Sequence, residues 1–254
     1  MKRMCAAFSA FAVVISAFAA PVQERMVKKE FKGASGNVFR YRWAEKLPAS
    51  GEKVPLVIFL HGAGERGTDN TAQLRHGLTE LLDYLEKNEK GYRILAGQVP
   101  HGKRWVEVDW AAKAHRMPKE PSQTMALQLE LLDSLLDDPR TDAARVYVTG
   151  ISMGGYGTWD IVSRRPEVFA AAMPICGGGD TAQAARISNV PIWTFHGSAD
   201  GAVPVSRSRD MVSALWAAGS NAHYREYPEA GHNVWTPAYR DNSVLKWFFG
   251  RRRK

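Results

Sequence analysis

The chain alternates between short apolar runs and amphipathic stretches. Residues 54–60 are almost entirely apolar, which is typical of a strand buried on both faces of a parallel sheet. Residues 122–138 place apolar side chains on one face at the period of an amphipathic helix. Residues 27–43 form two short runs around a turn, and the second run alternates apolar and basic side chains. This alternation predicts an antiparallel, half-exposed edge strand.

The same patterns predict the remaining elements. We expect strands at residues 146–149, 170–175, 191–196 and 223–227. We expect helices at residues 71–87, 153–164, 181–187, 204–218 and 242–249. Strands alternating with helices imply one α/β domain, with a mostly parallel sheet, antiparallel N-terminal strands and helices on both faces. In such a fold the functional side chains lie in loops at the carboxyl ends of the strands.

The N-terminal segment has the features of a secretory signal peptide. Lys2 and Arg3 precede an apolar run that ends in the small-x-small sequence of residues 17–19. The run is short for a membrane span, although a retained anchor helix is the alternative. We therefore expect a signal peptide at residues 1–19, a catalytic domain at residues 20–250 and no integral membrane segment after cleavage. The predicted location is secreted or periplasmic.

Charge and cysteine content narrow the possible classes of function. The formal net charge is +8, but removal of Lys2 and Arg3 leaves +6, and residues 251–254 carry four of those positive charges. The folded body is thus nearly neutral, which argues against a nucleic-acid partner. The basic end is expected to be a solvated tail, with loose attraction to anionic surfaces as the alternative. Cys176 is the single cysteine after the signal peptide, so no disulfide can form within the mature chain.

A G-x-S-x-G motif identifies a candidate nucleophile. Gly150, Ser152 and Gly154 lie where a predicted strand runs directly into a predicted helix, which is the context that a nucleophile elbow requires. Glycines are needed there because neighbouring backbone passes close to the turn. The alternative is a glycine-rich turn whose serine caps the helix.

A serine nucleophile needs a histidine base and a carboxylate that orients the histidine. His232 follows the last predicted strand within a glycine-bearing loop, and Asp200 follows the strand before it. The order serine, aspartate, histidine is the one expected of an α/β-hydrolase. Asp180 and Glu229 are the alternative acids, and a helix-capping role is the alternative for Asp200. His196 precedes the acid so closely that we expect a local backbone or packing role for it.

The loop after the first buried strand predicts an oxyanion hole. Small residues in His61-Gly62-Ala63-Gly64 let backbone amides point at one position. We expect the amides of Ala63 and Met153 to bind the oxyanion, with Gly64 as the alternative to Ala63. Glu65 and Arg66 follow in the same loop. We expect them to brace it by pairing with each other or with neighbours, and direct substrate contact is the alternative.

Tryptophans suggest the character of the substrate. Trp105, Trp110 and Trp235 fall in loops expected at the active-site face, where they could bind flat acyl groups or sugar rings. Core packing is the alternative for each. The other tryptophans considered are expected in the core: Trp159, Trp193, Trp216 and Trp247.

These motifs together resemble bacterial secreted esterases of the α/β-hydrolase superfamily, related to polyhydroxybutyrate-depolymerase-like and prolyl-oligopeptidase-like catalytic domains. The resemblance covers nearly the whole mature chain. It implies a serine esterase without metal or organic cofactor, and it supports the roles of Ser152, Asp200 and His232. Two departures limit it. The propeller domain of the peptidases has no counterpart before residue 54, and dienelactone-hydrolase-like relatives carry cysteine at the position of Ser152.

The sequence therefore predicts a secreted carboxylic-ester hydrolase that acts through an acyl-enzyme on a small-molecule or carbohydrate ester. Two alternatives remain open. One is a serine peptidase or amidase with the same triad. The other is a non-catalytic carbohydrate-binding protein on a hydrolase scaffold.

Overall fold

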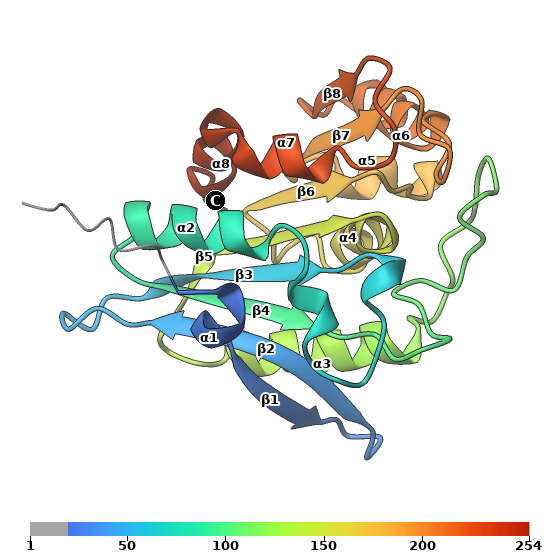
Figure 1. The fold of residues 1–254 in the computed structure, drawn as a ribbon. Helices are drawn as coiled ribbons and strands as arrows, with labels where there is room; N and C mark the ends of the chain where they lie inside the picture. The colour runs from blue at the N-terminus through green and yellow to red at the C-terminus, as the bar shows by residue number, and fades with distance from the viewer. Residues whose placement is uncertain (1–19, 254) are drawn as a thin grey trace, which may run out of the picture.

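The apolar runs become the strands of an eight-stranded sheet in the computed structural model, which describes residues 20–253 (Figure 1). The strand order is β1-β2-β4-β3-β5-β6-β7-β8. Strands β4, β3 and β5 to β8 are parallel, and β1 and β2 join antiparallel at one edge. The predicted mostly parallel sheet is thus confirmed. The strands are β1 (Val27–Lys32), β2 (Val38–Lys46), β3 (Val54–Leu60), β4 (Tyr92–Gly97), β5 (Thr141–Ile151), β6 (Ala171–Ile175), β7 (Trp193–Gly197) and β8 (His223–Tyr227).

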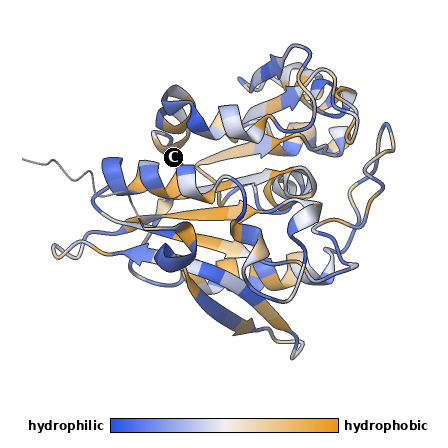
Figure 2. Ribbon diagram, viewed as in Figure 1, coloured by the Kyte–Doolittle hydropathy of each residue, from blue (hydrophilic) through white to orange (hydrophobic). Residues whose placement is uncertain are grey.

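Helices cover both faces of the sheet, because each face carries its own hydrophobic cluster. Helices α3 to α6 pack on one face, and α1, α2, α7 and α8 pack on the other. Figure 2 shows the apolar strands enclosed between these layers. The helices are α1 (Val22–Arg25), α2 (Leu78–Asn88), α3 (Gln123–Leu136), α4 (Met153–Arg164), α5 (Ala184–Ile187), α6 (Ser206–Ala217), α7 (Trp235–Arg240) and α8 (Asn242–Phe249), with 3-10 turns η1 (Ala63–Glu65), η2 (Ala72–Leu74) and η3 (Thr181–Gln183).

The strand predicted as a half-exposed edge is an interior strand. β2 pairs with β1 on one side and β4 on the other, so β1 forms the edge of the sheet. Arg42 is buried because its guanidinium donates to the carbonyls of Asn70 and Met26, at 2.6 and 2.5 Å. The alternating basic residues therefore misled the prediction, since this cation finds backbone acceptors instead of water.

The helix predicted at residues 71–87 is divided in two. η2 and α2 are separated at Gly77, whose φ of 76° is left-handed. A Cβ at Gly77 would also lie 2.6 Å from the Tyr239 ring. The segment predicted at residues 181–187 is likewise η3 followed by α5. The sequence did not predict β4, α1, α7 or the 3-10 turn η1, and Trp235 begins α7 instead of lying in a loop.

The basic end of the chain is attached to the body. The side chains of Arg251, Arg252 and Arg253 are exposed, as expected of a solvated tail. Their backbone is held, however, because the Arg253 amide donates to Ala144 O at 2.9 Å and the Tyr147 hydroxyl donates to Arg251 O at 2.7 Å. The predicted signal peptide lies outside the described residues. Within them, no helix has the length and apolar character needed to cross a membrane.

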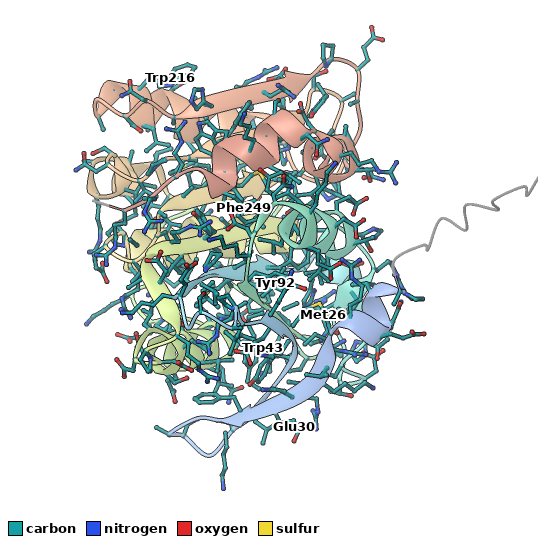
Figure 3. The ribbon with its side chains drawn as sticks, turned by 90° about the vertical axis from the view of Figure 1, so that its left-hand side faces the viewer. Met26, Glu30, Trp43, Tyr92, Trp216 and Phe249 are labelled. Carbon is teal, nitrogen blue, oxygen red and sulfur yellow. The ribbon has the colours of Figure 1, made fainter. Side chains whose placement is uncertain are left out.

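The tryptophans expected in the core are divided between core and surface. Trp159 is buried, while Trp193 and Trp247 are partly buried against the cluster that covers the α8 face. Trp216 is 54% exposed, so its core assignment was wrong (Figure 3). Its indole nitrogen donates to Ala222 O at 2.9 Å. The ring therefore lies at the surface and contacts the segment between α6 and β8.

Candidate active site

Ser152 occupies a strained turn between β5 and α4. Its φ and ψ of 54° and −117° depart from the conformations that most L-residues adopt. Its amide donates to Ile175 O at 2.8 Å, which ties the turn to β6. Such strain persists only where the surrounding structure imposes it, and it is concentrated at functional sites.

Backbone contacts explain the two glycines that flank Ser152. A Cβ at Gly154 would lie 1.8 Å from Leu60 O, and a Cβ at Gly150 would lie 2.4 Å from Gly154 O. Real Cβ atoms do not approach backbone so closely. The start of α4 thus sits directly on the end of β3, which raises the serine above the carboxyl edge of the sheet.

The structure brings Ser152, His232 and Asp200 together. His232 Nε2 lies 2.9 Å from Ser152 Oγ, and His232 Nδ1 lies 2.6 Å from Asp200 Oδ2. Because an ionised carboxylate only accepts, His232 Nδ1 carries the proton and Nε2 is free to accept from the serine hydroxyl. The histidine is 25% exposed, while the carboxylate is fully enclosed.

Several donors converge on Asp200. The amides of Ala202 and Val203 donate to Oδ1 at 2.8 and 2.9 Å, and His196 Nε2 lies 3.1 Å from Oδ2. Burial raises the pKa of Asp200, but the hydrogen bonds from both histidines and both amides outweigh burial and hold the pKa below its usual range. His196 has the local backbone contact that we expected, since Nε2 lies 3.1 Å from Val203 O, and it contacts Asp200 in addition.

His61 braces the loop that carries the predicted oxyanion hole. The ring is buried, with Nδ1 donating to Gly62 O at 2.6 Å and Nε2 accepting from the Val99 amide at 2.9 Å. Burial, assisted by Arg66, lowers the pKa of His61 to about 4 despite its bond to the Gly62 carbonyl. A neutral ring is the form that can make both bonds.

The predicted oxyanion donors flank Ser152. Ala63 begins η1 and lines the pocket, and Met153 is the first residue of α4. The N-terminal amides of a helix have no acceptor within the helix, so Met153 offers its N–H beside the serine. Ala63 therefore lies in the lining of the pocket over Ser152 and Met153 follows Ser152 directly, as the predicted oxyanion hole requires.

A pocket of about 330 Å³ opens over Ser152 and His232. Its walls include two of the three tryptophans proposed to contact substrate, Trp110 and Trp235. Trp105 is a correction: it is 0% exposed, and its indole nitrogen donates to His61 O at 3.1 Å beneath the loop. The pocket is lined by Gly62, Ala63, Gly64, Glu65, His76, Trp110, Ile151, Ser152, Ala202, Val203, His232 and Trp235.

Aromatic contacts fix the two tryptophan walls. Trp235 stands edge-on to His232, with ring centroids 5.4 Å apart and planes at 88°. On the other wall, the guanidinium groups of Arg66 and Arg104 lie 5.8 and 4.4 Å from the Trp110 ring. The Tyr156 hydroxyl donates to Trp110 O at 3.0 Å and holds that loop against α4.

Glu65 and Arg66 pair with different neighbours instead of with each other. Glu65 Oε1 lies 3.7 Å from His76 Nε2 and 3.8 Å from Arg75 Nη1. Arg66 Nε donates to Ala63 O at 2.8 Å. His76 also contacts the Trp235 ring at 5.5 Å. His76 lies within the helix predicted at residues 71–87 and was not among the predicted site residues, so this pocket residue was missed.

The alternative acids do not reach the histidine. Asp180 caps η3 and accepts from the Met117 amide at 3.0 Å. Glu229 is exposed and has a left-handed φ of 56°. Neither carboxylate has a contact to His232 like that of Asp200.

Among residues 20–253, one group of side chains has donor atoms close enough to share a metal ion. It comprises Cys176, His196 and Asp200, with atoms within 4.8 Å of one another. The Cys176 thiol donates to His232 O at 3.1 Å, and burial raises its pKa well above the usual range. The thiol is therefore protonated, and the carboxylate is saturated by hydrogen bonds, so this group is poorly suited to bind a metal.

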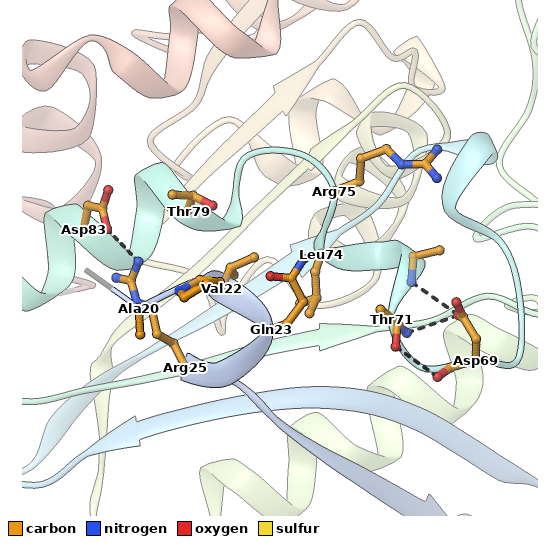
Figure 4. Close-up of a pocket in the computed structure, with 12 residues that line it drawn as sticks. Ala20, Val22, Gln23, Arg25, Asp69, Thr71, Leu74, Arg75, Thr79 and Asp83 are labelled. Atoms are coloured by element: carbon orange, nitrogen blue, oxygen red, sulfur yellow. Dashed lines mark hydrogen bonds and ion pairs between the residues drawn. The ribbon is translucent and has the colours of Figure 1, made fainter. Parts of the chain in front are cut away.

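A larger pocket of about 760 Å³ lies on another part of the molecule, between α1 and the segment from η2 to α2 (Figure 4). There Arg25 Nη1 pairs with Asp83 at 2.7 Å and holds α1 against α2. None of Ser152, Asp200 and His232 lines this pocket.

Comparison with known proteins gives the family. The sequence profile of the dienelactone hydrolase family matches residues 84–243. The chain belongs to this family. A solved structure described as a thermostable esterase is 35% identical, with a TM-score of 0.81 over 91% of this chain and 64% of that chain. The predicted α/β-hydrolase fold is thereby confirmed.

Two curated relatives are each 29% identical in sequence to this chain. A Salmonella typhimurium protein named "Putative carboxymethylenebutenolidase" is 29% identical over 51% of this chain and 55% of its own. The bifunctional acetylxylan esterase/xylanase of Neocallimastix patriciarum is 29% identical over 82% of this chain and 29% of its own. The chain thus spans about half or less of the curated relatives it matches here. Their names agree with the prediction of a carboxylic ester hydrolase in this family.

Proposed function

We propose that this protein is a serine carboxylic-ester hydrolase in which Ser152, His232 and Asp200 form the catalytic triad. The observation that carries the proposal is the continuous hydrogen-bonded series from Ser152 Oγ through His232 to Asp200, with distances of 2.9 and 2.6 Å. A pocket that opens over this series and membership of a hydrolase family support it.

The first half of the reaction forms an acyl-enzyme. His232 Nε2 removes the proton from Ser152 Oγ, which attacks the ester carbonyl carbon. The carbonyl oxygen becomes an oxyanion and accepts hydrogen bonds from the amides of Ala63 and Met153. The tetrahedral intermediate collapses, the bond to the alcohol oxygen breaks, and His232 gives its proton to the departing alcohol.

The second half returns the free enzyme. A water molecule gives a proton to His232 and attacks the acyl carbon, and the carboxylic acid leaves as Ser152 recovers its proton. Asp200 remains ionised in both halves and stabilises the transient imidazolium. The hydrogen bonds that Asp200 accepts and its lowered pKa suit that role.

The pocket walls and the names of relatives support a proposal for the substrate class. Trp110 and Trp235 line a pocket of about 330 Å³, which suits a small acyl group and a planar or sugar-like portion. The acetylxylan esterase relative acts on an acylated carbohydrate by its name. We therefore propose esters of carbohydrates or of aromatic acids as substrates. We also propose that residues 1–19 direct export, so that the enzyme acts in the periplasm or outside the cell.

Replacement of the nucleophile tests the mechanism. Ser152→Ala is expected to lower kcat/KM on a short-chain nitrophenyl ester by about 10⁴-fold or more. Ser188→Ala is a matched control, because that hydroxyl lies at the surface and donates to Ala185 O. An organophosphate should label Ser152 in the wild-type protein. Retained activity in Ser152→Ala would contradict the proposal, and faster turnover of a peptide anilide would favour an amidase instead.

A further inference from the structure

Glu65 is a buried carboxylate that the proposed mechanism does not use. Its side chain is 7% exposed, and it lines the pocket beside Ser152. A Cβ at Gly62 would lie 2.9 Å from Glu65 Oε2 and 3.6 Å from Ser152 Cβ, so Gly62 separates the carboxylate from the serine. The Glu65 carboxylate thus lines the pocket, and Gly62 lies between it and the proposed nucleophile.

Its hydrogen bonding differs from that of other buried acids in the described chain. Asp160 accepts two hydrogen bonds from Arg164, at 2.8 and 3.1 Å. Asp180 accepts from the amides of Met117 and Ala182, both at 3.0 Å. In residues 20–253, Glu65 has ion-pair contacts at 3.7 and 3.8 Å but accepts no hydrogen bond at ordinary length. The Glu65 oxygens are not among the fully enclosed polar atoms without a partner, so they face the pocket, where a ligand hydroxyl can donate to them in place of water.

The neighbours of Glu65 indicate the kind of donor. The Arg75 guanidinium lies 3.8 Å from the carboxylate and offsets its charge, and His76 Nε2 lies 3.7 Å from the same oxygen. A neutral hydroxyl therefore fits the position better than an ammonium group does. His76 in turn contacts the Trp235 ring, so an apolar platform adjoins the polar pair. A hydroxyl beside a flat apolar face is the arrangement that a sugar ring presents.

We propose that Glu65, supported by His76, binds a free hydroxyl of the substrate and so makes the site selective for esters of sugars or other polyols. This inference rests on the proposed function and adds a specificity determinant to it. In the bound state the hydroxyl donates to the Glu65 carboxylate, while the ester carbonyl lies over Ser152. Esters without a nearby hydroxyl would leave the carboxylate without a donor.

The test compares two substrates in each variant. We take the ratio of kcat/KM for a monoacetylated xyloside, which keeps free hydroxyls, to kcat/KM for nitrophenyl acetate. Glu65→Gln is expected to lower this ratio about 10- to 100-fold, the usual loss for a hydrogen bond to a charged group. Glu80→Gln is the control, because Glu80 pairs with Arg240 outside the pocket.

Two further measurements keep the test decisive if Glu65→Gln folds poorly. His76→Asn alters a more exposed residue and should lower the ratio in the same direction. The wild-type protein should prefer the free-hydroxyl xyloside over its fully O-methylated acetate by a similar factor. Equal loss on both substrates would mean that Glu65 only positions the loop, and preference for an amino-acid ester would identify an ammonium site; either result overturns the inference. Failure of Ser152→Ala to abolish activity would instead overturn the proposed function.

Discussion

His196 Nε2 lies 3.1 Å from Asp200 Oδ2, the same oxygen that binds His232. On its other side, His196 Nδ1 lies 2.7 Å from Ser208 Oγ. Since Nε2 faces two acceptor oxygens, from Asp200 and Val203, it must carry a proton. His196 is therefore a positioning residue for the proposed triad acid.

Removal of this imidazole should weaken catalysis through Asp200. His196→Phe is expected to lower kcat by about 10- to 100-fold, because the carboxylate loses one of the donors that hold its pKa down. A carboxylate with fewer donors should stabilise the protonated form of the His232 base more strongly, so the acid limb of the activity profile should move to higher pH. The measurement is kcat/KM against pH on a nitrophenyl ester, with the exposed His223→Asn as control. An unmoved acid limb would assign His196 a structural role only.

The turn at Ser152 should tolerate no side chain at Gly154. Gly154→Ala places a Cβ against Leu60 O, so β3 and α4 would have to separate. We expect unfolding, or a loss of about 3 kcal/mol or more in the free energy of unfolding. Gly64→Ala meets open space and should change stability by less than about 0.5 kcal/mol. Urea denaturation of both variants checks this, and equal midpoints would disprove the close approach.

The tryptophans should separate by phenotype. Trp105→Ala removes a fully buried ring and is expected to cost about 3 to 5 kcal/mol of stability. Trp110→Ala should leave the thermal midpoint nearly unchanged and raise KM for aromatic or sugar esters, because Trp110 lines the pocket. Thermal denaturation and steady-state kinetics distinguish the two. A destabilised Trp110→Ala with unchanged KM would remove Trp110 from the substrate site.

Stability should fall in mild acid because of His61. The folded protein holds the pKa of His61 at about 4, whereas the unfolded chain has the ordinary value of 6.5. Between these values the unfolded chain binds the proton and the folded one does not. The contribution of His61 to the free energy of unfolding is thus complete above pH 6.5. It declines by about 3 kcal/mol as the pH falls toward 4.

Denaturation midpoints at several pH values test that prediction. His61→Asn should show a shallower loss of stability in this window, while the exposed His101→Asn should keep the wild-type slope. Identical slopes in all three proteins would show that other groups control the acid response.

The sequence predicted most of the framework because periodicity reports burial. The bounds of β3, β8, α4 and α8 agree with the predicted ranges. Strand β4 was missed, since Arg93 interrupts its apolar run. That cation is buried only because Glu45 and Asp138 pair with it from distant segments, at 2.8 and 2.9 Å. No local sequence pattern predicts ion-pair partners that lie so far away in the sequence.

The site could be predicted only in part for a similar reason. Ser152, Asp200 and His232 each follow a strand, and the carboxyl ends of parallel strands meet at one edge. The positions of the residues that line the pocket depend instead on long loops. Trp105 and Trp110 lie only five positions apart in one such loop, yet the first is buried and the second lines the pocket. Similarly, His76 reaches the pocket from a turn that Gly77 redirects.

The fixed C-terminal backbone has a practical consequence for work with this protein. Arg253 binds Ala144 near the start of β5, whereas Ser152 follows the last residue of that strand. Eight residues of extended chain separate the two points by roughly 26 Å. A linker that follows Arg253 would therefore emerge at the amino ends of the parallel strands, away from the carboxyl end of β5 that precedes Ser152 (Figure 1). Coupled to a resin through that linker, the protein would present its pocket to the surrounding liquid.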